Sequence, residues 1–313
     1  MEHRPDIARV TEFLTTYLGH APTDVTAVGS GAWSTAFAFT DGDRALIIRF
    51  GLHRDDFSRD RVASRFSSDD LPIPQVIAIG HAAPFARDFA ISTRAYGHFI
   101  DLATGSEMQA LLPSLFATLD AMRAADLSAL SGFGAWDASG NAWFSTWREA
   151  LLDIAIDRPD HRTHGWRTAL ETSPVGARIF DESYLRLITT LDDLRDVEIE
   201  RHLIHSDLLN FNVFVEGDRI ASVFDWGCAM TGDHLYDLAW FVFWQPWYPE
   251  WRALDFVSAY REHLAAQGIV EPAFETRLRA CLLHIGLADQ AYNASLGRWG
   301  EITTRGARMM RIA

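Results

Sequence analysis

Residues 202–226 read HLIHSDLLNFNVFVEGDRIASVFDW, and three polar residues recur there at fixed intervals. Asn212 follows Asp207 by five residues, and Asp225 follows Asn212 by thirteen. Two apolar stretches flank an EGD sequence at 216–218, which predicts a hairpin. A hairpin of this length returns Asp225 to the side of Asn212. We therefore expect one cluster of two carboxylates and one amide at its mouth.

The cluster suits metal-assisted phosphoryl transfer. Hard oxygen donors such as Asn212 and Asp225 suit Mg²⁺, which keeps several waters and bridges nucleotide phosphates. Asp207 is placed to accept the proton of an attacking hydroxyl. Because the transition state is loose, positioning and charge neutralisation matter more than strong basicity. We expect structural roles for His205, beside the catalytic loop, and for Asp237.

The chain before this segment predicts a small antiparallel sheet with one helix. A helix is expected at 6–17, where apolar residues recur at helical spacing. Strands are expected at 25–39, 45–50, 71–80 and 89–93, with a polar helix at 56–66. The DGD turn at 41–43 joins the first two strands.

Helical patterns dominate after Gly97. They are expected at 107–125, 143–157, 164–173, 177–195 and from 235 to about 296. The fold class expected from these patterns is therefore α+β, with a small β-rich N-lobe at 1–97 and a larger helical C-lobe at 98–313.

Composition excludes several classes of protein. A formal net charge of −14 gives no basic face for nucleic acid, and it favours a cationic small molecule. The chain has no lysine, which excludes a Walker phosphate loop and Schiff-base chemistry. Neither cysteine lies in a C-x-x-C pair, and no apolar run is long enough to span a bilayer. We expect a cytoplasmic monomer.

Several motifs carry a resemblance to a known family. FDWG at 224–227, followed by GDHLYDLA at 232–239, resembles the aminoglycoside phosphotransferases, which have the kinase fold. The resemblance extends in order through residues 10–295, and within the family it is strongest to the hygromycin B phosphotransferases. It is carried by LPIPQVIAIG (71–80), ADLSALSGFG (125–134), TWR (146–148), HLIHSD (202–207), FDWGCAMTGD (224–233), FWQPW (243–247) and LHIGLADQ (283–290).

The resemblance implies a two-lobed protein-kinase-like fold. Residues 1–97 would be the nucleotide-binding N-lobe, and residues 98–313 would be the helical C-lobe with the catalytic loop, the metal site and an acceptor-binding wall. It also implies roles for residues of the N-lobe. VGSGAWSTAF at 28–37 would be the nucleotide-binding loop, with Ser34 near the phosphates. Arg49 stands where kinase folds carry a lysine, and its planar fork can hold two phosphate oxygens. Its usual partner is a Glu on the next helix, but no Glu occurs between residues 40 and 106. Asp60 is the first choice for that partner and Asp56 the second.

The resemblance also implies the ligands. The connector containing Thr93 and Ala95 would bind adenine, and the donor would be ATP or GTP with Mg²⁺. The acceptor would be an aminoglycoside, with hygromycin B first, and its phosphorylation would give antibiotic resistance. A polycation calls for carboxylates and aromatic faces. The candidates are Asp126, Tyr236, Trp244 and Trp247, with Glu149 weaker.

The chain departs from the hygromycin B phosphotransferases at two places. Phe211 stands where they carry Asn, and Cys228 stands where they carry an acidic residue. Two alternatives therefore stay open. One is a kinase of another small alcohol or aminoglycoside-like metabolite. The other is a nucleotide-binding pseudokinase that acts as a scaffold.

Overall fold

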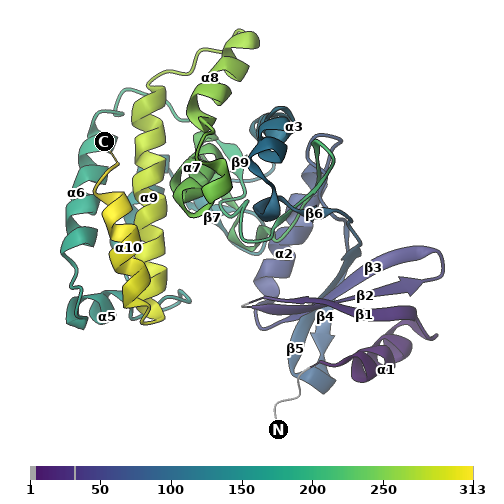
Figure 1. Cartoon of the computed structure of the whole chain (residues 1–313). Helices are drawn as coiled ribbons and strands as arrows, with labels where there is room; N and C mark the ends of the chain where they lie inside the picture. The colour runs from purple at the N-terminus through teal and green to yellow at the C-terminus, as the bar shows by residue number, and fades with distance from the viewer. Residues whose placement is uncertain (1–4, 32, 313) are drawn as a thin grey trace.

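The N-lobe is an antiparallel sheet of five strands in the order β1-β2-β3-β5-β4 (Figure 1). The strands are β1 (Thr23–Ser30), β2 (Ser34–Asp41), β3 (Arg44–Gly51), β4 (Val76–Ala82) and β5 (Arg87–Thr93). The coordinates are a computed structural model that describes residues 5–31 and 33–312, so Ala32 of the predicted nucleotide loop lies outside them.

Helix α1 (Ile7–Leu18) closes one face of this sheet. The Asp6 side chain caps it by accepting the Arg9 N–H at 2.9 Å, and Gly19 ends it in the left-handed conformation. Its apolar side chains Val10 and Leu14 are fully buried in one cluster with the sheet. Helix α2 (Arg54–Ala63) packs on β4 and β5 and also contacts the turn after Asp225, so it links the two lobes.

The single strand expected at 25–39 is wrong. The chain turns after Ser30, where the Gly31 N–H donates to the Ser34 carbonyl at 2.9 Å, and it returns as β2. Apolar alternation runs across both strands, so periodicity alone could not show the turn. The β2–β3 hairpin joined by the DGD turn forms as predicted, with Asp41 paired to Arg44.

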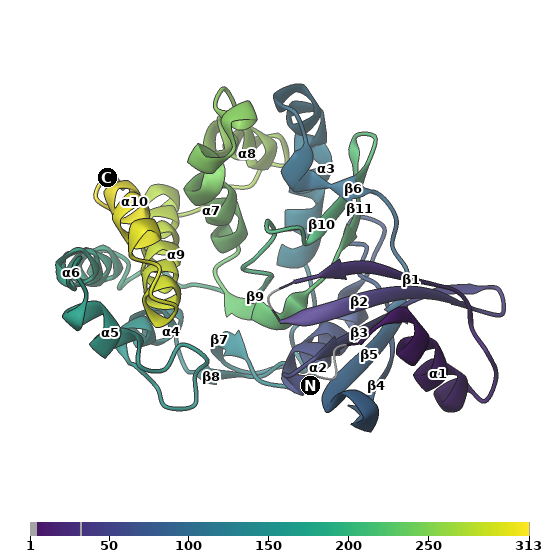
Figure 2. The ribbon, with the colours of Figure 1, turned by 60° about the horizontal axis from the view of Figure 1, so that its bottom comes forward.

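A second β layer lies between the N-lobe sheet and helix α3 (Gly105–Arg123) (Figure 2). β6 (His98–Phe99) pairs with β10 (Val213–Glu216), and β10 pairs with β11 (Arg219–Val223). Strand β6 therefore belongs to the same sheet as β10 and β11. A further sheet of four strands has the order β8-β7-β12-β9. Its strands are β7 (Phe133–Trp136), β8 (Ala142–Phe144), β9 (His202–Ile204) and β12 (Met230–Gly232).

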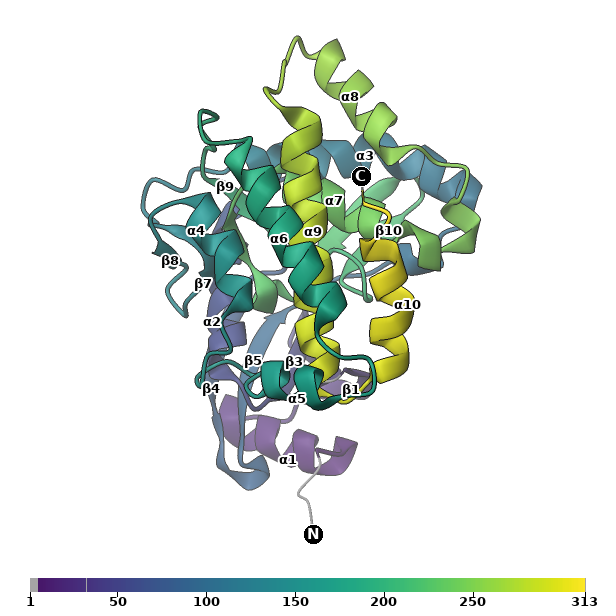
Figure 3. The same cartoon turned by 90° about the vertical axis from the view of Figure 1, so that its left-hand side faces the viewer.

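Helices make up the rest of the C-lobe. They are α4 (Trp147–Leu152), α5 (Trp166–Thr172), α6 (Arg178–Asp192), α7 (Leu235–Trp244), α8 (Phe256–Ala266), α9 (Phe274–Ser295) and α10 (Trp299–Met309). The long helix α9 is buried at the centre, with α5, α6, α7 and α10 packed around it (Figure 3). None of the helices formed by the described residues is long and apolar enough to cross a membrane.

The helix expected at 143–157 is wrong in its first part. Residues Ala142–Phe144 are strand β8, which pairs with β7 across a turn that contains Gly140. The helix begins only at Trp147, where Thr146 and Glu149 form a reciprocal capping box. The capping residues therefore mark the true start.

Candidate active site

The catalytic loop follows strand β9 and is fixed from below by Asp237. The carboxylate of this buried residue on α7 accepts the His205 and Ser206 N–H groups, each at 2.8 Å. Burial lowers the pKa of His205 to about 4, so its imidazole is neutral. It accepts the Asp207 N–H at 3.2 Å and contacts the Phe224 carbonyl at 3.0 Å. These contacts fix the backbone that carries Asp207, and they are structural, as expected for both residues.

Two amides hold the Asp207 carboxylate. The Asn212 Nδ2 donates to the Asp207 carbonyl at 2.8 Å and to its Oδ2 at 3.1 Å. The Asn210 Nδ2 donates to Oδ1 at 2.6 Å. Burial and the nearby carboxylates of Asp225 and Asp101 raise the pKa of Asp207 well above its usual range, against these hydrogen bonds. The carboxylate is thus both oriented and made more basic.

The β10–β11 hairpin brings Asp225 back to Asn212, as the spacing predicts. Val213 pairs with Val223, and the Phe224 N–H donates to the Asn212 carbonyl at 3.0 Å. The NH₂ group of Asn212 donates its hydrogen bonds to Asp207. Its Oδ1 atom therefore remains available as a metal ligand. Asp225 is half exposed, and its Oδ1 lies 3.7 Å from Arg49 Nη1. One amide oxygen and one carboxylate suit Mg²⁺, because water and phosphate oxygens complete its octahedron.

Arg49 and Asp60 form a buried ion pair inside the N-lobe, and Asp60 also reaches the C-lobe through a hydrogen bond. The guanidinium of Arg49 on β3 bonds the carboxylate of Asp60 on α2. The other Asp60 oxygen accepts the Trp226 N–H at 2.7 Å. Burial lowers the pKa of Arg49, but the charges of Asp60 and Asp225 outweigh it, so the pKa is raised overall. Asp56, the second-choice partner, instead contacts Arg59 and Arg162 at 3.1 and 2.6 Å.

A cleft of about 480 Å³ between the lobes collects most of the predicted site. Its lining includes every residue predicted for the nucleotide and the metal: Ser34, Arg49, Asp60, Thr93, Ala95, Asn212 and Asp225. In the connector, the Thr93 and Arg94 N–H groups are committed to the Gln75 and Ala45 carbonyls at 3.0 and 3.1 Å. Ala95 is therefore the connector residue that we expect to donate to a base.

The predicted acceptor residues do not all lie together. Tyr236 is 2% exposed, and its hydroxyl contacts His284 Nδ1 at 2.9 Å, so it lies in the core and not on a wall. Asp126 lies on the loop after α3 and accepts the Ser128 N–H at 2.9 Å. The same loop contains Leu130, whose carbonyl accepts a hydrogen bond from Arg201. Arg201 precedes strand β9, whereas Asp207 follows the other end of that strand. Among the described residues, the hydrogen bond of the Asp126 carboxylate is to Ser128 and not to the catalytic loop.

Trp244 and Trp247 do form a pair, with ring centroids 5.4 Å apart. The next residue, Tyr248, donates its hydroxyl to Asp101 Oδ1 at 2.8 Å. Asp101 in turn accepts the Asn210 and Phe211 N–H groups at 2.9 and 3.0 Å. The segment containing Trp247 is therefore tied to the catalytic loop. Glu149, the weaker candidate, forms the capping box with Thr146 at the N-terminus of its own helix, α4.

Sequence analysis missed Asp101 and Asn210. Asp101 belongs to no motif, and only its position after β6 brings it to the loop. Asn210 is three residues beyond Asp207. A polar side chain at this point of the motif was the sequence signal that could have predicted its contact with Asp207. Both Asn210 and Phe211 have left-handed backbones, with φ of 63° and 66°. Such a pair turns two successive N–H groups toward one carboxylate.

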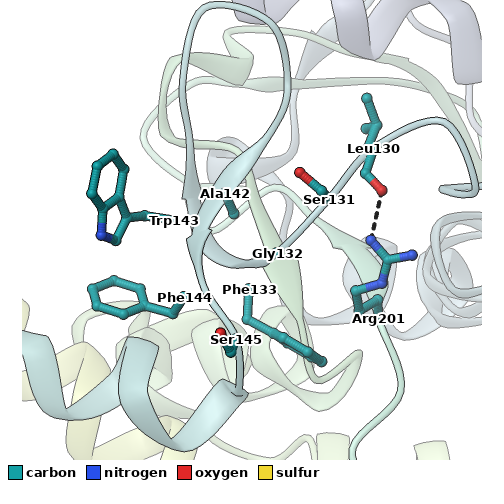
Figure 4. Close-up of a pocket in the computed structure, with 9 residues that line it drawn as sticks. All are labelled: Leu130, Ser131, Gly132, Phe133, Ala142, Trp143, Phe144, Ser145 and Arg201. Atoms are coloured by element: carbon teal, nitrogen blue, oxygen red, sulfur yellow. Dashed lines mark hydrogen bonds between the residues drawn. The ribbon is translucent and has the colours of Figure 1, made fainter.

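A second hollow, of about 490 Å³, lies at the β7–β8 hairpin (Figure 4). Among the described residues that line it there is no carboxylate, and Arg201 donates to the Leu130 carbonyl at 2.7 Å. Trp143 at its edge is 88% exposed. Of the described residues, none predicted for the site lines this hollow, whereas seven of them line the interlobe cleft.

Comparison with known proteins shows the family of this chain. A model of the phosphotransferase enzyme family matches residues 24–273, and the chain belongs to this family. The protein is thus a kinase-fold phosphotransferase with an alcohol as acceptor. Among its relatives, it is 35% identical to the hygromycin-B 4-O-kinase of Escherichia coli over 274 residues, which covers 87% of this chain and 74% of that protein.

Solved structures give the same picture. A thermostable mutant of the aminoglycoside phosphotransferase APH(4)-Ia, in a ternary complex with AMP-PNP and hygromycin B, is 31% identical with a TM-score of 0.81, and 97% of each chain is covered. The spectinomycin phosphotransferase APH(9)-Ia is 13% identical with a TM-score of 0.59 over 98% of each chain, which shows a shared fold.

Proposed function

We propose that the protein transfers the γ-phosphate of ATP to a hydroxyl of hygromycin B or a closely related aminoglycoside. The observation that carries this proposal is the oriented carboxylate of Asp207, held by two amides beside the Asn212–Asp225 pair. The hygromycin-B 4-O-kinase relative and the complex of APH(4)-Ia with AMP-PNP and hygromycin B support the choice of acceptor and donor.

The chain's own residues divide the work. Asp207 orients the acceptor hydroxyl and accepts its proton as the bond to phosphorus forms. Arg49 and the loop around Ser34 hold the phosphates, with Asp60 fixing the guanidinium. Asn212 and Asp225 would hold Mg²⁺, which supplies neutralisation of phosphate charge. The connector at Ala95 would position the base.

A turnover panel tests the proposal. Nucleotide consumption and product mass are measured with Mg²⁺, ATP or GTP, and hygromycin B, other aminoglycosides and small alcohols. Turnover and a product one phosphate heavier with hygromycin B support it. Activity on another compound alone moves the acceptor assignment. Nucleotide-dependent thermal stabilisation without any turnover would favour a binding-only pseudokinase and contradict it.

The acceptor wall gives a separate prediction. Trp247→Ala removes an aromatic face from the segment that Tyr248 links to the catalytic loop through Asp101, and a cationic aminoglycoside would use such a face. We expect the KM for hygromycin B to rise about 10-fold, with the KM for ATP unchanged, since about 1.4 kcal/mol of cation–π contact is lost. Trp143→Ala, at the exposed outer hollow, is the matched control and should change neither constant. Equal effects of the two variants would remove Trp247 from the acceptor site.

A further inference from the structure

We infer that Asn210 is a positioning residue for the transfer, because its side-chain amide sets the plane of the Asp207 carboxylate. This inference rests on the proposed role of Asp207 as the group that orients the acceptor hydroxyl. An ionised carboxylate accepts hydrogen bonds only, so the atom of Asn210 at 2.6 Å from Asp207 Oδ1 is its NH₂ nitrogen.

The two donors act on different oxygens of Asp207. Asn212 occupies Oδ2 at 3.1 Å and Asn210 occupies Oδ1 at 2.6 Å. With one donor, the carboxylate could still rotate about the Cβ–Cγ bond. With one donor on each oxygen, rotation of the carboxylate would break at least one hydrogen bond. Each oxygen has two lone pairs, so one pair on each stays open for a hydroxyl. The pair of amides therefore preorganises the carboxylate without blocking it.

The backbone beneath Asn210 is itself held. Asp101 accepts the N–H groups of Asn210 and Phe211 through its two oxygens, and Tyr248 donates to the same carboxylate. Asn210 has a φ of 63°, in the left-handed region that Asn, Asp and Gly adopt most readily. Asn is thus one of the few residues that both accept this backbone and present a short side-chain donor.

The neighbouring side chain has a different task. Phe211 is 53% exposed, and its ring meets Phe99 edge-to-face with centroids 5.1 Å apart. A phenyl ring has no hydrogen-bond donor for the Asp207 carboxylate. Of these two neighbouring side chains, Asn210 makes the polar contact with Asp207.

Three substitutions separate positioning from backbone shape. Asn210→Gly keeps the left-handed backbone and removes the donor. Asn210→Asp keeps the shape and the backbone preference, but places a second carboxylate against Asp207. Asn210→Ala removes the donor and adds backbone strain. If position 210 serves only the turn, activity should follow Asn ≈ Asp ≈ Gly, with Ala lowest. If the amide positions Asp207, Asp should be the worst of the three, because it repels the carboxylate that it faces.

The measurement is steady-state kinetics on the full chain with ATP, Mg²⁺ and hygromycin B, together with acceptor affinity by calorimetry in the presence of a non-hydrolysable ATP analogue. For Asn210→Gly we expect kcat to fall roughly 10- to 30-fold, the scale of one hydrogen bond to a charged group expressed in the transition state. Acceptor affinity and the KM for ATP should change less than 2-fold, and the melting temperature should change by only a few degrees. Asn210→Asp should fall further in kcat, again with a native melting temperature. Asp218→Asn, on the exposed turn of the β10–β11 hairpin, is the control and should keep kcat within about 3-fold of wild type.

The outcomes are distinguishable from failure of the proposed function. If wild type turns over and Asp207→Asn abolishes turnover, while Asn210→Gly and Asn210→Asp keep native kcat, the inference about Asn210 is overturned and the function stands. The same holds if kcat and melting temperature fall together in all three variants, which would indicate a structural role. If wild type has no turnover with any acceptor, the proposed function itself fails.

Discussion

Asp207→Asn is expected to lower kcat at least about 1,000-fold while leaving nucleotide binding intact, which is the upper range of general acid–base contributions. The substitution keeps the side chain's shape and removes both the charge and the proton acceptor. It also turns a group that accepts two amide donors into one that must donate itself. The change therefore acts on the step at which the acceptor hydroxyl loses its proton.

The fold should survive this change. Burial raises the pKa of Asp207, which means that the folded protein holds its charged form at a cost. Removing that charge relieves the cost, so the melting temperature should not fall. Asp218→Asn, on the exposed turn of the same β10–β11 hairpin, is the matched control and should retain wild-type kcat. Near-native turnover by Asp207→Asn would show that Asp207 is not the group that activates the acceptor.

The catalytic hairpin could be predicted from the sequence because the residues that define it lie close together in the chain. The spacing from Asp207 through Asn212 to Asp225 and the turn at 216–218 fix a register that needs no distant contact. The Arg49–Asp60 pair could also be predicted, because an Arg near the end of a strand is followed closely in the chain by an acidic helix. In both cases the partners are set by one supersecondary unit.

The rest of the site depends on contacts between distant segments. Asp101 reaches the catalytic loop only because β6 pairs with β10, more than a hundred residues later. Tyr236 and Trp244 share one helix, and their apolar pattern does not tell which face meets the core. The structure buries Tyr236 against His284 and leaves Trp244 partly exposed. Tertiary packing, which the pattern does not contain, decides such residues.

Asp60→Asn should be the most destabilising of the substitutions considered, because it leaves a buried cation without its partner. Arg49 and Asp60 side chains are 17% and 6% exposed, and removing one member of such a pair costs about 3–5 kcal/mol. Burial raises the pKa of Asp60 against the charge of Arg49, so removing the carboxylate relieves part of this cost, but the buried cation that remains outweighs it. For a chain of this size that lowers the melting temperature by roughly 10 °C. Asparagine still accepts the Trp226 N–H, so the loss comes from the charge. Asp192→Asn, whose arginine partners lie in exposed pairs, should cost less than about 1 kcal/mol.

The same substitution should lower activity about 100-fold, the scale of a misplaced positioning group. Without Asp60, the nearest carboxylate to Arg49 is Asp225, whose Oδ1 is 3.7 Å from Nη1. The guanidinium is then drawn onto a group that would hold Mg²⁺, so the KM for ATP rises and kcat falls. The double variant Arg49→Met, Asp60→Asn separates the two effects. It buries no unpaired charge, so its melting temperature should recover most of the loss, whereas its turnover should not recover. Recovery of turnover together with stability would mean that the pair only stabilises the fold and does not position the phosphates.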